Sequence, residues 1–83
     1  MKPGIAGTLE SNDAVITVRP AADRHIVIHS IVDAFYHDQI KKAIESVLDE
    51  GMISGLDVLC EDKGALDCTI KARLRAAIAR MEG

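Results

Sequence analysis

Apolar and polar residues alternate in short runs along the first third of the chain. The runs Ile5 to Leu9 and Ala14 to Val18 are both typical of β-strands, and the second extends to Arg19 before Pro20. Between them lies Ser11-Asn12-Asp13, a strong turn sequence because Asn and Asp accept left-handed backbone angles and hydrogen-bond to their own main chain. The pattern therefore predicts a turn that presents the Ser11 hydroxyl to solvent.

A third strand is predicted from His25 to Ile31, after a connection over 19–24 that contains Pro20 and Asp23. Period-two alternation places His25 and His29 on the same face as Val27. Because the connection is short, the simplest expectation is that the strand at 14–19 and the strand at 25–31 form a hairpin.

The period changes to that of a helix from about Phe35. Apolar residues then recur at spacings of three and four, with Asp33 as a possible N-cap and Gly51 well placed to end the helix. The members of this stripe are Tyr36, Ile40, Ala43, Ile44, Val47 and Leu48.

The last third of the chain predicts a strand and a second helix. Leu56 to Glu61 alternates like a half-buried strand, and Asp62 is a possible N-cap for the helix that follows. The stripe of that helix consists of Leu66, Ile70, Leu74, Ala77, Ile78 and Met81, with Arg73, Arg75 and Arg80 beside it. The order predicts a single α+β domain over residues 1–83, with two helices packed on one face of a small, mostly antiparallel sheet.

Composition narrows the possible functions. The net charge of −3 gives no electrostatic reason to bind nucleic acid, and the two aromatic residues, Phe35 and Tyr36, offer no platform for base stacking. No apolar run approaches the roughly 20 residues that span a bilayer, and the first residues lack the apolar region of a signal peptide. We therefore expect a soluble cytoplasmic protein that binds neither nucleic acid nor membrane.

Candidate catalytic and metal-binding chemistry is weak. His25 and His29 lie roughly 13 Å apart along a predicted strand, so they do not converge on a metal as structural zinc ligands do, and His37 stands apart. Cys60 and Cys68 match no zinc or redox spacing, which favours packing roles for both, with a regulatory thiol as the weaker alternative. Because no phosphate-binding loop, dinucleotide motif or nucleophile elbow is present, an independent enzyme is not expected.

The residues alone leave two interpretations of Ser11 open. It is either an ordinary turn serine that satisfies local backbone groups, or a point of covalent attachment, since no nucleophile-activating partner stands beside it.

Two separated motifs resemble one known family. The segment Ala6-Gly7-Thr8-Leu9-Glu10-Ser11 and the segment Asp62-Lys63-Gly64-Ala65-Leu66-Asp67-Cys68, followed by Ala72-Arg73-Leu74, are similar to the acyl carrier (gamma) subunit of citrate lyase. The resemblance in length and motif order covers nearly the whole chain. Asn12 stands where familiar members have glycine, a replacement that the turn conformation tolerates.

The resemblance implies a non-catalytic carrier that differs from the four-helix-bundle carriers of fatty-acid synthesis. In that family the serine that matches Ser11 carries phosphoribosyl-dephospho-CoA through a phosphodiester. The implied partners are the alpha (acyl transferase) and beta (citryl lyase) subunits and a prosthetic-group transferase. Glu10 and Asp13 beside Ser11 would serve docking of that transferase or, as slightly favoured, solvation of the tip.

Two alternatives remain open. The chain could be the carrier of a sibling lyase such as citramalate lyase, because substrate choice would belong to the partner subunits. It could also be an unmodified interaction or regulatory module that binds a partner through its sheet face or its helices. Arg73, Arg75 and Arg80 could form a docking patch for an acidic partner, although a solvated helix face is the favoured interpretation.

Overall fold

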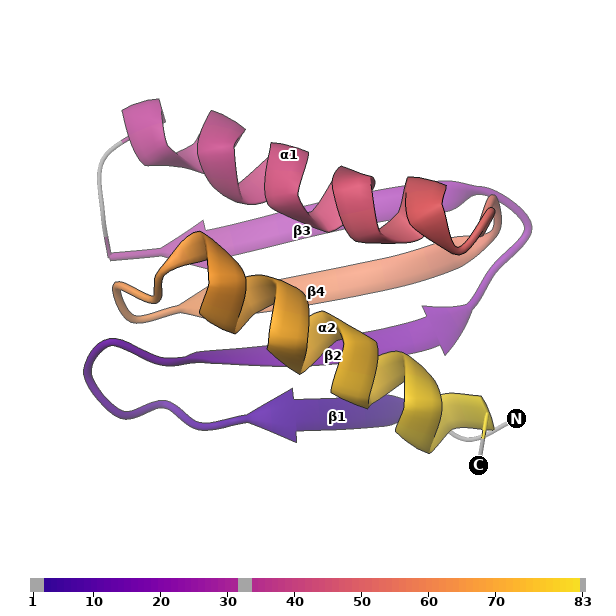
Figure 1. Ribbon diagram of the computed structural model, residues 1–83, viewed down its shortest axis with the longest axis horizontal. Helices are drawn as coiled ribbons and strands as arrows, with labels where there is room; N and C mark the ends of the chain where they lie inside the picture. Colours follow the sequence, from indigo (N-terminus) through magenta and orange to yellow (C-terminus); the bar gives the residue numbers. More distant parts are fainter. Residues whose placement is uncertain (1–2, 32–33, 83) are drawn as a thin grey trace.

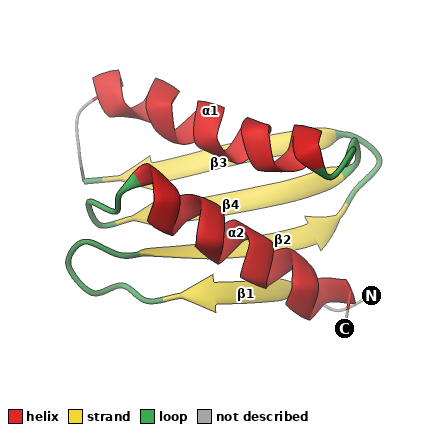
Figure 2. Ribbon diagram, in the orientation of Figure 1, coloured by secondary structure: helices red, strands yellow, loops and turns green. Residues whose placement is uncertain are grey.

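The computed structural model describes residues 3–31 and 34–82. It contains four strands and two helices in the order β1 (Gly4–Gly7), β2 (Ala14–Pro20), β3 (Arg24–Ser30), α1 (Ala34–Glu50), β4 (Leu56–Asp62) and α2 (Asp67–Glu82). Figures 1 and 2 show both helices lying across the same side of a single sheet. The predicted two-layer α+β fold is therefore confirmed.

The sheet has the strand order β1-β2-β4-β3. The neighbours β1 and β2, and β2 and β4, run antiparallel, whereas β3 and β4 run parallel. A parallel pair needs a long crossover, which α1 supplies by carrying the chain across the sheet between β3 and β4 (Figure 1).

The predicted hairpin between the second and third strands is wrong. Strand β4 lies between them, and the short connection at 21–23 passes over its first residue, where the Leu56 amide donates to the carbonyl of Asp23 at 3.2 Å. Because β4 is central, its residues Leu56, Val58 and Cys60 are buried beneath the helices. A hairpin of β2 and β3 would have taken this central position and excluded that burial of β4.

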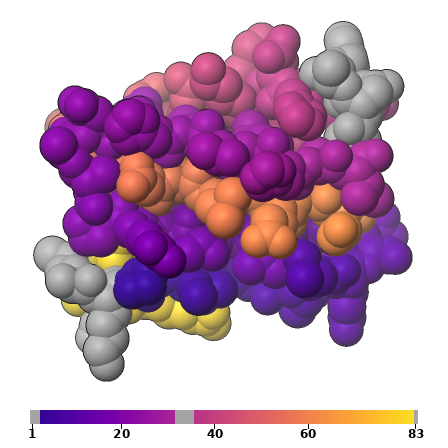
Figure 3. Space-filling view, turned by 180° about the vertical axis from the view of Figure 1, so that it is seen from behind, coloured from indigo at the N-terminus to yellow at the C-terminus, as the bar shows by residue number. Residues whose placement is uncertain are grey.

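The core lies between the sheet and the helices. Alternate residues of β2 from Ala14 to Val18, and of β4 from Leu56 to Asp62, face the helices and are buried. Helix α1 contributes its apolar stripe from Ile40 onward, and α2 contributes its stripe from Ile70 onward, whereas Tyr36 at the start of the predicted α1 stripe is exposed. The fully packed members are Ala6, Ala14, Ile16, Val18, Ile40, Ala43, Ile44, Val47, Leu48, Leu56, Val58, Cys60, Ile70, Leu74 and Ala77. The opposite face of the sheet is covered by no element of the described chain (Figure 3).

The end of β1 and the cap of α1 differ in part from expectation. Strand β1 stops at Gly7, whose φ of 108° breaks the extended backbone, so Leu9 belongs to the following loop. Helix α1 ends before Gly51 as expected, but Met52 takes the left-handed conformation, with φ 52°. Its amide donates to the Asp49 carbonyl at 3.1 Å in a Schellman-type C-cap. The predicted cap Asp33 lies outside the described residues.

Helix α2 begins without a polar cap. The Leu66 carbonyl accepts the first helical hydrogen bond, from the Ile70 amide at 3.0 Å, so Leu66 holds the N-cap position that we predicted for Asp62. The Leu66 side chain is 71% exposed and lies outside the buried stripe on which we predicted it.

Candidate functional site

Ser11 lies at a corner of the loop 8–13 that joins β1 to β2. The Asp13 amide donates to the Glu10 carbonyl at 3.2 Å and closes a four-residue turn, in which Asn12 has φ 65°. That angle is the left-handed conformation expected of this residue, so the predicted turn is confirmed. Ser11 is exposed, and its hydroxyl makes no hydrogen bond with any of the described residues.

Asp13 connects the two sides of this loop. Its Oδ2 accepts a hydrogen bond from Thr8 Oγ1 at 2.7 Å, and its Oδ1 accepts one from the Ala14 amide at 2.7 Å. Thr8 Oγ1 in turn accepts from the Glu10 amide at 3.2 Å. These local bonds satisfy polar groups at the base of the loop and leave only its tip without side-chain support.

Arg73 of α2 binds the same carboxylate in a two-point contact. Its Nε lies 3.0 Å from Asp13 Oδ1 and its Nη2 lies 2.9 Å from Oδ2. The hydrogen bonds from Arg73, and then those from Thr8 and Ala14, hold the pKa of Asp13 well below its usual value, while the carboxylate raises the pKa of Arg73. The expected solvating role of Asp13 is therefore wrong, because its side chain is only 14% exposed and anchors the loop.

The turn after β4 supports the loop from a second direction. The Asn12 amide donates to the Lys63 carbonyl at 2.8 Å, and the Lys63 amide donates to the Asp13 carbonyl at 2.9 Å. Gly64 has φ 91°, and a Cβ built there would lie 3.7 Å from Asn12 Oδ1. The motif around Ser11 and the motif from Asp62 onward are thus one structural unit, although about fifty residues separate them in sequence.

Asp62 organises this turn from within the protein. It is 2% exposed, and its Oδ1 accepts from the Ala65 amide at 2.8 Å while its Oδ2 accepts from Ser30 Oγ at 2.7 Å. The carboxylate therefore caps the turn at 63–65 and ties that turn to β3. We expected Asp62 to cap α2, but this turn precedes the helix.

The other arginines of α2 do not form one docking patch. Arg75 pairs with Glu50 of α1 at 3.2 Å, and Arg80 donates to the carbonyl of Ile5 in β1 at 2.6 Å. Each of the three arginines thus ties α2 to a different segment. Sequence reasoning missed these roles, because only their position off the apolar stripe was visible in the sequence.

The two cysteines have different environments. Cys60 is buried, and burial, followed by the nearby Asp62 and Glu61 charges, raises the pKa of its thiol to about 12. Its predicted packing role is confirmed. Cys68 is exposed in the first turn of α2, so the same prediction for Cys68 is wrong.

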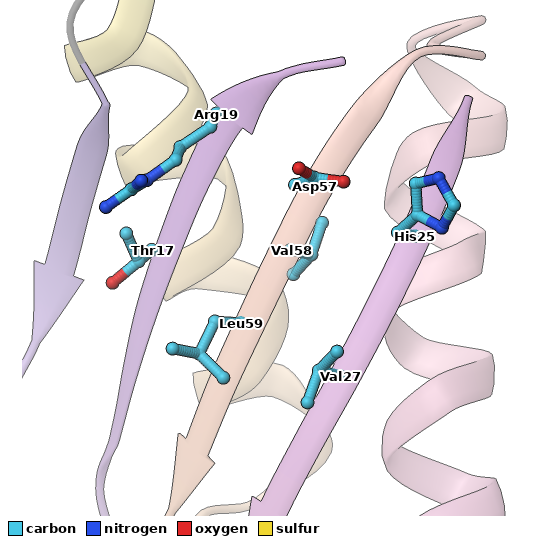
Figure 4. A pocket seen from close by; sticks show the side chains of 7 residues that line it. All are labelled: Thr17, Arg19, His25, Val27, Asp57, Val58 and Leu59. Carbon is cyan, nitrogen blue, oxygen red and sulfur yellow. The ribbon is translucent and has the colours of Figure 1, made fainter. Parts of the chain in front are cut away.

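The open face of the sheet carries a shallow hollow far from Ser11. Figure 4 shows its lining by Thr17, Arg19, His25, Val27, Asp57, Val58 and Leu59. The residues Arg19, Asp57 and His25 form one row across β2, β4 and β3, at the end of the strands opposite the Ser11 loop. As predicted, His25 and His29 share this face with Val27, whereas His37 lies on α1 across the sheet.

The structure is thus a small two-layer α+β domain with an exposed serine on an anchored loop, and none of the described residues hydrogen-bonds to that serine hydroxyl. Residues 1–81 match the family described as malonate decarboxylase delta subunit. The fold is similar to that of a chain in the crystal structure of a Pseudomonas malonate decarboxylase hetero-tetramer in complex with malonate. The TM-score is 0.77 at 18% identity, over 96% of this chain and 88% of the other.

Relatives with higher identity are named citrate lyase acyl carrier protein. The relative from Treponema denticola is 40% identical, over 95% of this chain and 91% of its own length. The relative from Streptococcus uberis is 43% identical, over 100% of this chain and 83% of its own length. The chain belongs to this family of citrate lyase acyl carrier proteins, and it is a non-catalytic carrier subunit rather than an enzyme.

Proposed function

We propose that this protein is the acyl carrier subunit of a citrate lyase complex and that Ser11 bears its prosthetic group, phosphoribosyl-dephospho-CoA. The observation that carries the proposal is the exposed Ser11 hydroxyl, which makes no hydrogen bond with the described residues and lies on a loop that is fixed from α2 and from the β4–α2 turn. The names of relatives at 40% identity and above supply the substrate class.

The residues present fit such a group. A phosphodiester on Ser11 Oγ would break no hydrogen bond among the described residues, and the corner position leaves the solvent side open. Asn12 and Asp13 hold the backbone on the inner side, through the bonds to Lys63 and Arg73. The attached group can therefore project outward without displacing a side chain that supports the loop.

The protein's part in the reaction is to tether. When bound, the group supplies the thiol that carries acetyl and citryl thioesters, and the chain contributes no acid or base of its own. Ser11 is the covalent anchor, and the Asp13–Arg73 pair keeps its loop folded while the arm reaches the partner subunits. Tethering holds an intermediate at an effective concentration on the order of millimolar at each partner site.

We propose the alpha (acyl transferase) and beta (citryl lyase) subunits as those partners. The transferase would exchange the acetyl group for citrate and release acetate, and the lyase would cleave the citryl group to oxaloacetate and leave an acetyl group on the arm. None of the described helices is long and apolar enough to cross a membrane. We propose a cytoplasmic location for the carrier and its complex.

A carrier of citramalate lyase would use the same residues. Reconstitution of the complex with citrate and with citramalate therefore separates these two substrates.

Intact-mass analysis tests the proposal. The chain is co-expressed with the prosthetic-group transferase and the other lyase subunits, and we expect a mass gain equal to one arm, which peptide mapping places on Ser11. Ser11→Ala should remove the mass gain and citrate cleavage, whereas Ser54→Ala, a substitution at another exposed serine, should keep both. Full cleavage by a complex with Ser11→Ala would refute the proposal and favour an unmodified interaction module.

A further inference from the structure

Exposed apolar side chains concentrate at the end of the molecule that carries Ser11. Within the described chain seven large hydrophobic residues are exposed, and four of these lie at this end: Leu9, Ile31, Tyr36 and Leu66. Figure 1 shows the β1–β2 loop, the β4–α2 turn and the first turns of both helices gathered there. Strand β1 begins and helix α2 ends at the other end of the molecule.

Leu66 has no role in the fold that would explain its exposure. It occupies the N-cap of α2, where a side-chain oxygen would accept an orphan helical amide and a leucine cannot. Its side chain is 71% exposed, so it adds little to the core either. Leu66 is one of the four exposed apolar residues gathered at this end of the molecule, and such a gathering marks a surface for contact outside the domain.

Leu66 and Tyr36 border a groove between the first turns of α1 and α2. The groove has a volume of about 190 Å³, and Gln39, Ile40 and Gly64 also line it. Gly64 adjoins the Ser11 loop, since its Cβ position is 3.7 Å from Asn12 Oδ1. Asp67 stands at the groove and makes no ion pair with the described residues.

Resting on the proposed function, we propose that this groove, which we call the Tyr36–Leu66 groove, is the docking site of the enzyme that attaches the arm to Ser11. Among the partners, only that enzyme must bring its active site to Ser11 Oγ itself; the lyase subunits meet the far end of a long arm. An interface of ordinary size covers about 800 Å² on each partner, so one centred on Ser11 extends over the groove. The matching surface on the enzyme is an apolar side chain flanked by a cation that faces Asp67.

Attachment kinetics with purified carrier and transferase test this surface. Leu66→Asn adds a helix cap and removes the apolar contact, so it should raise the melting temperature while it raises the KM for the carrier about tenfold, with kcat nearly unchanged. The matched control is Met52→Asn. It replaces another exposed apolar residue at a helix end with a residue suited to that end, and Met52 lies at the end of α1 away from Ser11. The control should raise the melting temperature and leave KM unchanged.

Leu66→Ala is a second variant that removes the same contact without a new polar group, and it should raise KM in the same way. An unchanged KM for both Leu66 variants would overturn the proposal. So would normal loading of these variants followed by loss of citrate cleavage, because the groove would then serve the lyase subunits. Failure of the wild-type chain to be loaded on Ser11 would instead contradict the proposed function.

Discussion

Arg73 and Asp13, which stand 60 positions apart, form a two-point ion pair with distances of 3.0 and 2.9 Å. One partner lies on the second helix and the other lies two residues after Ser11. The pair fixes the loop of the candidate attachment site to the helix that packs against β1 and β2.

The pair predicts a specific pH dependence. Because folding lowers the pKa of Asp13 below its ordinary 3.8, the stabilisation from its carboxylate is present above about pH 4 and is lost as the pH falls toward the folded value. In Arg73→Gln the pKa of Asp13 should rise toward 3.8. Carboxyl NMR titration of both proteins measures this, and identical Asp13 titrations would contradict it.

Loss of Arg73 should loosen the loop and spare the rest of the domain. We expect faster hydrogen exchange at the Asn12 and Lys63 amides in Arg73→Gln, since those amides bond across the segments that Arg73 holds together. Arg75→Gln is the matched control, because its ion pair with Glu50 joins the two helices away from the loop. Equal exchange rates in the two variants would show that Arg73 does not order the loop.

Met52→Gly should stabilise the protein. Met52 has φ 52° and a side chain that is 90% exposed, so the substitution removes left-handed strain without loss of packing. We expect a gain of about 1 kcal/mol in the free energy of unfolding, which corresponds to a rise of about 4–8 °C in melting temperature. Thermal and urea unfolding measure it, and an unchanged or lower stability would contradict the assignment of the cap.

Two glycines near Ser11 should respond differently to alanine. Gly7 has φ 108°, and an added Cβ would lie 1.7 Å from the Ala14 carbonyl oxygen, so the backbone at the base of the loop would have to move. Gly64 has φ 91°, but its Cβ position meets only an ordinary van der Waals contact with Asn12 Oδ1 at 3.7 Å, so its substitution should cost only about 1–2 kcal/mol of left-handed strain. Urea unfolding should show the larger loss for Gly7→Ala, and equal losses would be inconsistent with the close contact.

The cysteines should differ in reactivity toward a thiol reagent. Burial raises the pKa of Cys60 to about 12, so at pH 8 almost none of it is thiolate, whereas Cys68 is exposed. One thiol should react quickly in the folded protein and a second only after unfolding. Cys68→Ser should abolish the fast phase, and a fast phase that survives this substitution would disprove the assignment.

The sequence by itself determined most local structure. The strand and helix periods depend on which face of each segment is buried, so β2, β3, β4, α1 and α2 could be predicted to within a few residues. The Ser11 turn could also be predicted, because Asn12 accepts a left-handed angle through its own chemistry. The family resemblance could also be found in the sequence, because each of the two motifs is a run of contiguous residues.

Only the tertiary structure decided how those segments pair and which side chains come into contact between them. The position of β4 between β2 and β3 depends on a crossover whose pairing no local pattern encodes. The Arg73–Asp13 pair, the capping of a turn rather than a helix by Asp62, and the exposure of Cys68 likewise depend on neighbours that the fold brings together. Contacts over such separations form only when the sheet and helices pack, which is why they could not be predicted from the periodicity around each residue.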